Sequence, residues 1–248
     1  MSLTVTVLGS SGMFATRDRA CAGYIVDIDG YKLWLDAGSG SWRNLVTLMD
    51  YKQVEAVILT HRHPDHTSDL FQSYHARHYG QPDPLPRIPV WAPQETVDAI
   101  LGFVKDLEDS FQVQTVKAGD ELTVGGASMS FVEMAHPAET VGVRVTHEGS
   151  ILAYSADTGA DADFEKLAGG TDLFLCEATE QDSDDIWEGH LRASQAGEIA
   201  ARVGVKSLLL THLPPGRDHS LSLAEAKSTA GDVPVELAAD CKTWTVAP

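Results

Sequence analysis

A largely apolar run that ends in a cluster of histidines constrains this chain more than any other feature. Residues 54–59 predict a buried strand. Four side chains suited to metal binding follow within six residues: His61, His63, Asp65 and His66. They cannot share one face of a helix, but on a tight loop at a strand end they can converge on two adjacent ions. A polar loop, or a helix start capped by Asp65 or Ser68, is the alternative, and it leaves three histidines unexplained.

Three further candidate ligands each follow a predicted strand: His136, Asp157 and His212. Alone, each fits a turn residue better than a ligand. Together with the first cluster, however, the order of strand and then His or Asp occurs four times. Sheets in α/β proteins place their sites beyond the carboxyl ends of strands. We therefore expect these side chains to join the first cluster, with imidazole and carboxylate groups that suit zinc and also accept manganese or iron.

Short strand patterns alternate with helical ones along the whole chain. Strands are predicted at residues 3–8, 24–28, 32–35, 54–59, 111–116, 121–124, 128–134, 140–146, 151–154, 173–176, 207–210, near 235, and 243–246. Helices are predicted at residues 41–50, from the histidine cluster to about 78, and at 96–107, 161–168, 194–203 and 221–229. Four prolines predict a loop at 80–89, and acidic residues predict another at 181–189. No linker divides the chain, so we expect one α/β domain over residues 1–248, with two mixed sheets packed face to face and helices outside.

The charge and the cysteines limit the partners and the compartment. The formal net charge is −18, from 18 Lys and Arg against 36 Asp and Glu, which fits a highly solvated surface or one adapted to salt. Since polyanions bind through clusters of Lys and Arg, a long nucleic acid is a poor partner, and a small substrate is expected instead. The chain shows neither an export leader nor an apolar run of the roughly 20 residues that cross a bilayer. Cys21, Cys176 and Cys241 suggest no disulfide framework, so a cytoplasmic location without membrane contact is expected.

The full set of candidate ligands resembles that of the metallo-β-lactamase superfamily over nearly the whole chain. The resemblance lies in residues 60–66, in His136, in Asp157 of Tyr-Ser-Ala-Asp-Thr-Gly, and in His212 of Leu-Leu-Leu-Thr-His-Leu-Pro-Pro. It implies a four-layer αββα sandwich that holds two divalent metal ions. It assigns His61, His63 and His136 to one metal, Asp65, His66 and His212 to the other, and Asp157 to both as a bridge. Relatives often pair, so a homodimer is also expected.

A second set of residues resembles the ribonuclease Z branch and its smaller phosphodiesterase relatives. Residues 176–179, His190, residues 193–201 and residues 208–215 carry this likeness. It implies that Glu177 orients His190 as a proton donor, although Cys176 stands where that branch has His. The Pro-x-Lys-x-Arg-Asn loop of ribonuclease Z is absent from residues 15–20, and no insertion could form its basic arm. Compact bacterial phosphodiesterases, including those that cleave cyclic nucleotides, are the better match.

The expected reaction is hydrolysis of a small phosphodiester by a metal-bridging hydroxide. Asp65 would orient or deprotonate the nucleophile, and His190 would protonate the leaving oxygen. The alternatives are a ribonuclease Z-like endonuclease that trims tRNA 3′ ends without the arm, and a carbon-ester or thioester hydrolase. A β-lactamase would need an export leader, and a glyoxalase-type thioesterase normally adds a C-terminal helical region. A metal-binding protein without turnover is the remaining class, and the Glu177 and His190 pair argues against it.

Other polar residues receive weaker interpretations. Residues 9–12 predict a turn, because the Gly-Lys-Ser/Thr of a phosphate loop is missing. Arg17 and Arg19 are expected to be solvated, with contact to a substrate phosphate as the alternative. His75 and His78 are expected on a helix surface, and His219 has no assigned role.

Overall fold

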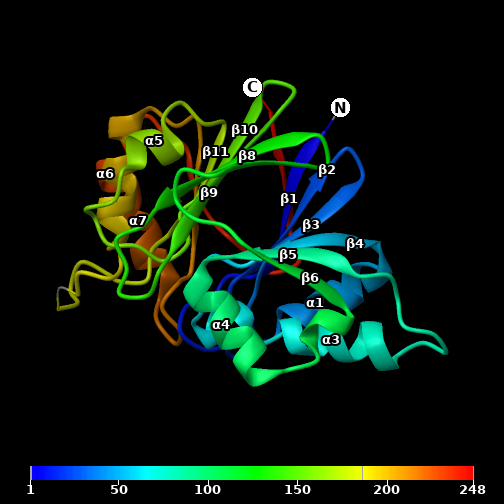
Figure 1. The fold of residues 1–248 in the computed structure, drawn as a ribbon. Helices are drawn as coiled ribbons and strands as arrows, with labels where there is room; N and C mark the ends of the chain where they lie inside the picture. Colours follow the sequence, from blue (N-terminus) through cyan, green and yellow to red (C-terminus); the bar gives the residue numbers. More distant parts are fainter. Residues whose placement is uncertain (1, 186, 248) are drawn as a thin grey trace.

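The computed structural model describes residues 2–185 and 187–247, and within them the strands form two seven-stranded sheets (Figure 1). The first sheet has the order β14 (Thr243–Val246), β1 (Leu3–Gly9), β2 (Gly23–Ile28), β3 (Tyr31–Ala37), β4 (Val54–Ile58), β5 (Ile88–Ala92) and β6 (Phe111–Thr115). The second has the order β13 (Val235–Leu237), β12 (Leu208–Thr211), β11 (Leu173–Glu177), β10 (Ser150–Tyr154), β9 (Val141–His147), β8 (Ala127–Glu133) and β7 (Glu121–Val124). Each sheet mixes parallel and antiparallel pairs, as predicted.

Helices cover the outer face of each sheet, which completes the predicted αββα sandwich (Figure 1). The first sheet carries α1 (Ser41–Leu48), α3 (Leu70–Tyr79) and α4 (Gln94–Phe103). The second carries α5 (Phe164–Ala168), α6 (Ala193–Val203) and α7 (His219–Thr229). A short helix, α2 (Pro64–Thr67), lies within the histidine cluster. None of the described helices is long and apolar enough to cross a membrane.

Three buried clusters hold the four layers together. The central one lies between the sheets and is built from strand residues that alternate toward it, such as Val5, Leu33, Phe131 and Leu175. The outer two lie between each sheet and its helices. Burial of apolar surface stabilises the fold by about 25 cal/mol per Å². The packing in these clusters therefore holds the two sheets in a fixed position relative to each other. They thereby set where the strand ends of both sheets meet.

Strand β5 differs from the expectation, because residues 88 and 89 were predicted to end a loop. Pro89 lies inside this strand, although proline disfavours central strands. The contacts explain why it is tolerated: β5 pairs with β6 along Ile88–Ala92, but with β4 only at Val90 and Trp91. At Pro89 the strand is therefore paired on one side only, and the missing N–H is not needed there.

Two predicted helices are shorter than expected. The helix predicted for 96–107 ends at Phe103, and a separate 3₁₀ turn occupies Leu107–Asp109. The helix predicted for 161–168 begins at Phe164, where the Asp163 side chain caps the first turn by accepting from the backbone N–H of Lys166. The remaining predicted elements are confirmed to within a few residues at each end. In the loop predicted for 181–189, Ile186 lies outside the described residues.

Candidate metal centre and active site

The candidate residues lie where strands of both sheets end at one edge of the sandwich. Strand β4 leads to His61, β10 leads to Asp157, and β12 leads to His212. Three residues at such strand ends, Asp36, Ala156 and His212, have φ angles of 56°, 53° and 50°. Left-handed backbone costs a non-glycine residue about 1–2 kcal/mol. Such backbone clusters at functional sites, where the surrounding structure holds it in place.

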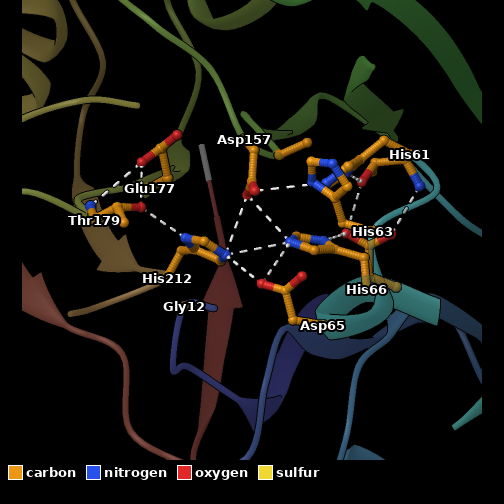
Figure 2. Close-up of polar contacts among 12 residues, drawn as sticks. Gly12, His61, His63, Asp65, His66, Asp157, Glu177, Thr179 and His212 are labelled. Carbon is orange, nitrogen blue, oxygen red and sulfur yellow. Dashed lines mark hydrogen bonds and ion pairs between the residues drawn. The ribbon is translucent and has the colours of Figure 1, made fainter. Parts of the chain in front are cut away.

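The seven predicted ligands form two groups that share Asp157. Figure 2 labels all of them except His136. The ligand atoms within each group lie within 4.8 Å of one another. One group contains His61, His63, His136 and Asp157, and the other contains Asp65, His66, Asp157 and His212. Oδ2 of Asp157 lies 3.5 Å from Nε2 of His61, and its Oδ1 lies 3.2 Å from Nε2 of His66 and 3.3 Å from that of His212. The structure thus brings all seven together in the sets that the family resemblance implies.

This arrangement suits divalent ions better than direct hydrogen bonding. Nitrogen ligands about 2.0–2.1 Å from a tetrahedral ion lie roughly 3.3–3.4 Å apart. Nε2 of His136 is 3.3 Å from Nδ1 of His63, and Nε2 of His66 is 3.3 Å from Nε2 of His212. Among the described residues, Nε2 of His61 and Oδ1 of Asp157 are buried without a hydrogen-bond partner, which is rare unless a ligand completes the site.

Burial also sets the charge of the first group. It lowers the pKa of His61, His63 and His136, so their imidazoles are neutral at pH 7. Neutral imidazole is the form that binds a metal. The donor set therefore fits two divalent ions in both chemistry and spacing.

Outer hydrogen bonds turn four of the five ligand histidines toward the cluster. The partners of Nδ1 are Thr60 Oγ1 for His61 (3.2 Å), Asp36 Oδ2 for His66 (2.8 Å), the Gly189 carbonyl oxygen for His136 (2.8 Å), and Thr179 Oγ1 for His212 (2.7 Å). In each ring Nε2 is left to face the cluster. Such outer partners fix the tautomer and the direction of a ligand histidine. His63 differs, because its Nδ1 faces His136.

Asp36 is a buried residue of this outer layer that the sequence reading overlooked. Its carboxylate accepts from the Thr60 backbone N–H (2.8 Å) and hydroxyl (2.9 Å), from Nδ1 of His66 (2.8 Å), and from the Tyr154 hydroxyl (2.9 Å). The residue directly follows the strand predicted at 32–35, so the pattern that identified Asp157 could have found it. Asp36 links the first sheet to Tyr154 of the second through one carboxylate.

Glu177 and His190 lie together beside both ligand groups. Nδ1 of His190 donates to Oε1 of Glu177 at 2.8 Å. The His190 ring lies 5.3 Å from that of His136 and 5.4 Å from that of His212, measured between ring centres. Burial opposes a charge on His190, but the carboxylate of Glu177 raises the pKa of His190 to about 9. The pair predicted from the family resemblance therefore places a cationic imidazole at the edge of the cluster.

Thr179 connects this pair to the ligand groups. Its hydroxyl donates to Oε2 of Glu177 at 2.6 Å, so it accepts from Nδ1 of His212 at 2.7 Å (Figure 2). Glu177 also accepts from the backbone N–H groups of Thr158 (2.6 Å) and Leu191 (3.3 Å). A fully buried carboxylate needs such donors. The Thr179 hydroxyl thus links the carboxylate that holds His190 to the ligand His212.

Gly12 packs directly against the ligand His212 (Figure 2), which the reading of residues 9–12 as a plain turn did not anticipate. A Cβ at Gly12 would lie 2.7 Å from Nδ1 and 2.8 Å from Cε1 of His212. We expect Gly12→Ala to displace the imidazole and lower kcat/KM about tenfold to hundredfold, the effect of disturbing a ligand's support. Gly102→Ala is the control, because a Cβ there meets nothing within 4 Å. Unchanged metal content and activity in Gly12→Ala would contradict the packing argument.

The other polar candidates lie outside the cluster. Arg17 is exposed, as expected. The expectation that Arg19 is solvated is wrong, because its Nη1 donates to Ser10 Oγ (2.6 Å) and to the Ala238 carbonyl oxygen (2.9 Å). It therefore holds loops in place. His75 and His78 lie along α3, and the ring of His78 stacks on Tyr74.

Comparison with known proteins agrees with this geometry. The family model described as a beta-lactamase superfamily domain matches residues 32–213. An uncharacterized protein of Mycobacterium tuberculosis is 34% identical over 241 residues, which cover 92% of this chain and 87% of that protein. A ribonuclease Z of Methanopyrus kandleri is 27% identical, over 91% of this chain and 92% of that enzyme.

A solved structure extends the likeness to the whole fold. YhfI of Bacillus subtilis, named a probable metallo-hydrolase, is 29% identical in sequence over 91% of this chain and 93% of its own. Its crystal structure superposes with a TM-score of 0.89 at 26% identity and covers 98% of both chains. The chain belongs to the β-lactamase superfamily, among its metallo-hydrolases of the ribonuclease Z-like branch.

Proposed function

We propose that this protein is a phosphodiesterase that hydrolyses small phosphodiesters such as cyclic nucleotides. The observation that carries the proposal is the His190 imidazole, held by Glu177 at 2.8 Å and placed beside ligands of both groups. A poor leaving group such as a sugar alkoxide needs a proton as its bond to phosphorus breaks. The site supplies a donor for that proton next to the place where a phosphoryl group would bind.

The ligand groups would hold two divalent ions, for which we propose zinc, with manganese or iron as alternatives. When bound, such ions polarise phosphoryl oxygens and lower the pKa of a water near phosphorus. Nδ1 of His190 donates to Glu177, so Nε2 carries the proton for the leaving oxygen. As the water oxygen bonds to phosphorus, it gives a proton to Asp65. The bond from phosphorus to the leaving oxygen breaks, and that oxygen takes the proton from Nε2 of His190. Asp65, a ligand with Oδ2 3.3 Å from Nε2 of His212, orients the attacking water.

The charge of the chain supports a small substrate. The net charge of −18 repels a long polyanion at the distances over which association is steered. Carboxylates also line the surface next to the site, where Asp161 and Glu188 face the same pocket as His136. A small substrate with a single phosphodiester needs to contact only the metal-ligand cluster. The negative charge of the chain therefore does not exclude such a substrate.

The second candidate is an endonuclease that trims tRNA 3′ ends, favoured by the likeness to the ribonuclease Z of Methanopyrus kandleri. A carbon-ester or thioester hydrolase is a third, because the same metal ligands activate water for those bonds. Neither of these explains the acidic surroundings of the site as directly. We further propose a cytoplasmic location for the activity, in keeping with the three free thiols, and a homodimer, which sedimentation would test.

Parallel assays distinguish these functions. One metal-loaded preparation is given a 3′,5′-cyclic nucleotide, a precursor tRNA and a simple carboxylic ester, with Asp65→Ala as the blank. Turnover of the cyclic nucleotide above the other two supports the proposal. Trimming of the tRNA without turnover of the cyclic nucleotide would overturn it.

Removal of the proton donor should depend on the leaving group. We expect His190→Ala to keep its metal and lose about 10²–10⁴-fold in kcat with an alkoxide leaving group. With nitrophenolate, which leaves without a proton, the loss should be much smaller. His219→Ala is the control, since His219 lies at the start of α7 and its Nε2 donates to the Pro214 carbonyl oxygen. An equal loss on both substrates would contradict proton donation by His190.

A further inference from the structure

A tryptophan next to the proposed proton donor has no role in the hydrolysis described above. Trp187 lies in the loop between β11 and α6, and its indole is 4.7 Å from the His190 ring and 5.9 Å from the His136 ring. A Cβ at Gly189 would lie 2.5–2.9 Å from the six-membered ring of the indole, so the ring lies directly over this glycine. These contacts hold one side of the indole, yet 47% of the residue is exposed.

Two adjoining pockets use Trp187 as part of their lining. The larger has a volume of about 590 Å³ and includes His136, Asp161 and Glu188. The smaller, of about 130 Å³, includes His190 and is also lined by Asp161, Trp187 and Glu188. Pockets of 300–1,000 Å³ hold small organic ligands. The larger pocket can therefore take a group the size of a nucleoside beside the ligand groups.

The position of His190 tells which part of a substrate would occupy this space. Because His190 protonates the leaving oxygen in the proposed reaction, the leaving alcohol lies on the His190 side of phosphorus. Trp187 and the smaller pocket lie beside His190, and the larger pocket shares Trp187 with the smaller one. They are therefore placed to contact the leaving group rather than the phosphoryl oxygens.

The chemistry of the lining narrows the class of leaving group. Asp161 and Glu188 are exposed carboxylates, and no Lys or Arg is among the described residues that line the larger pocket. Arg192 lines the smaller pocket, and its guanidinium donates to the Asp184 carbonyl oxygen. A second phosphate is disfavoured in the larger pocket, whereas sugar hydroxyls and exocyclic amines can donate to the carboxylates. The bare face of an indole binds the face of a nucleobase by stacking.

We propose that Trp187 is the platform for the nucleobase of the substrate, with Asp161 and Glu188 as acceptors for its hydroxyl or amino groups. This inference rests on the proposed phosphodiesterase function and names its substrate class as nucleotides without a further phosphate. Stacking on an aromatic side chain changes binding by about 1–3 kcal/mol per base. Loss of the indole should therefore cost about tenfold to hundredfold in kcat/KM on substrates that carry a base.

The test compares two cyclic phosphates that share the leaving oxygen and differ only in the base. One is 3′,5′-cyclic adenosine monophosphate, and the other is the 3′,5′-cyclic phosphate of methyl riboside. We expect Trp187→Ala to lose about tenfold to hundredfold more kcat/KM on the adenosine compound than on the base-free one. Trp187→Phe keeps an aromatic ring, so it should retain most of the kcat/KM on the adenosine compound that Trp187→Ala loses. Equal losses on both compounds would show that Trp187 only supports His190 and would overturn the proposal.

A binding measurement separates failure of this inference from failure of the proposed function. Adenosine monophosphate is titrated into metal-loaded protein while tryptophan fluorescence is recorded, with Trp244→Phe as the control variant. Quenching that Trp187→Phe abolishes and Trp244→Phe retains supports the platform even if neither cyclic compound is hydrolysed. Turnover of both compounds without such quenching would leave the function standing and overturn the platform. Quenching at Trp187 by phosphocholine but not by adenosine monophosphate would assign the indole to a quaternary ammonium group instead.

Discussion

Asp157→Ala is expected to remove both metal ions and lower kcat by about 10⁴-fold or more, the scale for residues that act as one catalytic unit. The reason is the shared position of this carboxylate, whose Oδ2 faces His61 at 3.5 Å and whose Oδ1 faces His66 and His212 at 3.2 and 3.3 Å. No other described residue belongs to both of these four-residue ligand groups. Metal content per chain, measured by elemental analysis alongside kcat, checks the result.

Two companion variants make this test specific. His63→Ala removes a ligand of one group only, so it should retain about one ion per chain. Asp232→Ala changes an exposed aspartate and should retain two ions and full activity. Two tightly held ions in Asp157→Ala would show that this carboxylate does not bridge the groups.

Asp36→Ala should weaken metal binding without removing a ligand. Four donors converge on the Asp36 carboxylate, including Nδ1 of His66 at 2.8 Å and the Tyr154 hydroxyl at 2.9 Å. Loss of an outer partner of this kind costs about tenfold to hundredfold in metal affinity. Burying the donors unpaired should also lower the free energy of unfolding by about 3–5 kcal/mol. Metal titration and urea denaturation of the same preparation measure the two effects.

A matched carboxylate separates the two effects. Asp172 is also buried, accepts from the backbone N–H of Ile151 at 2.7 Å, and lies in an ion pair with Lys206 outside the site. Asp172→Ala should lower stability and leave metal affinity unchanged. If Asp36→Ala behaved in the same way, Asp36 would have a role in folding alone.

The ligands could be predicted from the sequence because they obey a local rule. Each stands directly after a strand, or in the tight loop that follows one. The strand pattern just before each ligand therefore identifies it as a candidate. The αββα architecture followed from the alternation of strand and helix patterns together with the family resemblance. The same local reasoning missed β5, because Pro89 is tolerated there only through its one-sided pairing with β6. This pairing depends on residues 111–115, so it cannot be predicted from the sequence of residues 80–92 alone.

Residues whose importance comes from distant contacts were harder to predict. Gly12 matters because His212, 200 positions away along the chain, packs against it. Trp187 gains its position from His136 and from Gly189. Thr179 stood within a recognised segment, yet its link to His212 appears only when β11 and β12 lie side by side. Such contacts depend on the packing of the layers, which a linear pattern does not contain.

The outer hydrogen bonds around the ligand histidines mean that the site is preorganised before an ion binds. Four imidazoles already face inward in the folded chain, held by Thr60, Asp36, the Gly189 carbonyl and Thr179. Little side-chain freedom remains to be lost when an ion arrives, so the folding of the two sheets supplies the preorganisation. Selection among divalent ions would then depend on ion availability and ligand preference rather than on any rearrangement of the protein. The same folded site would therefore accept any divalent ion that His and Asp ligands suit.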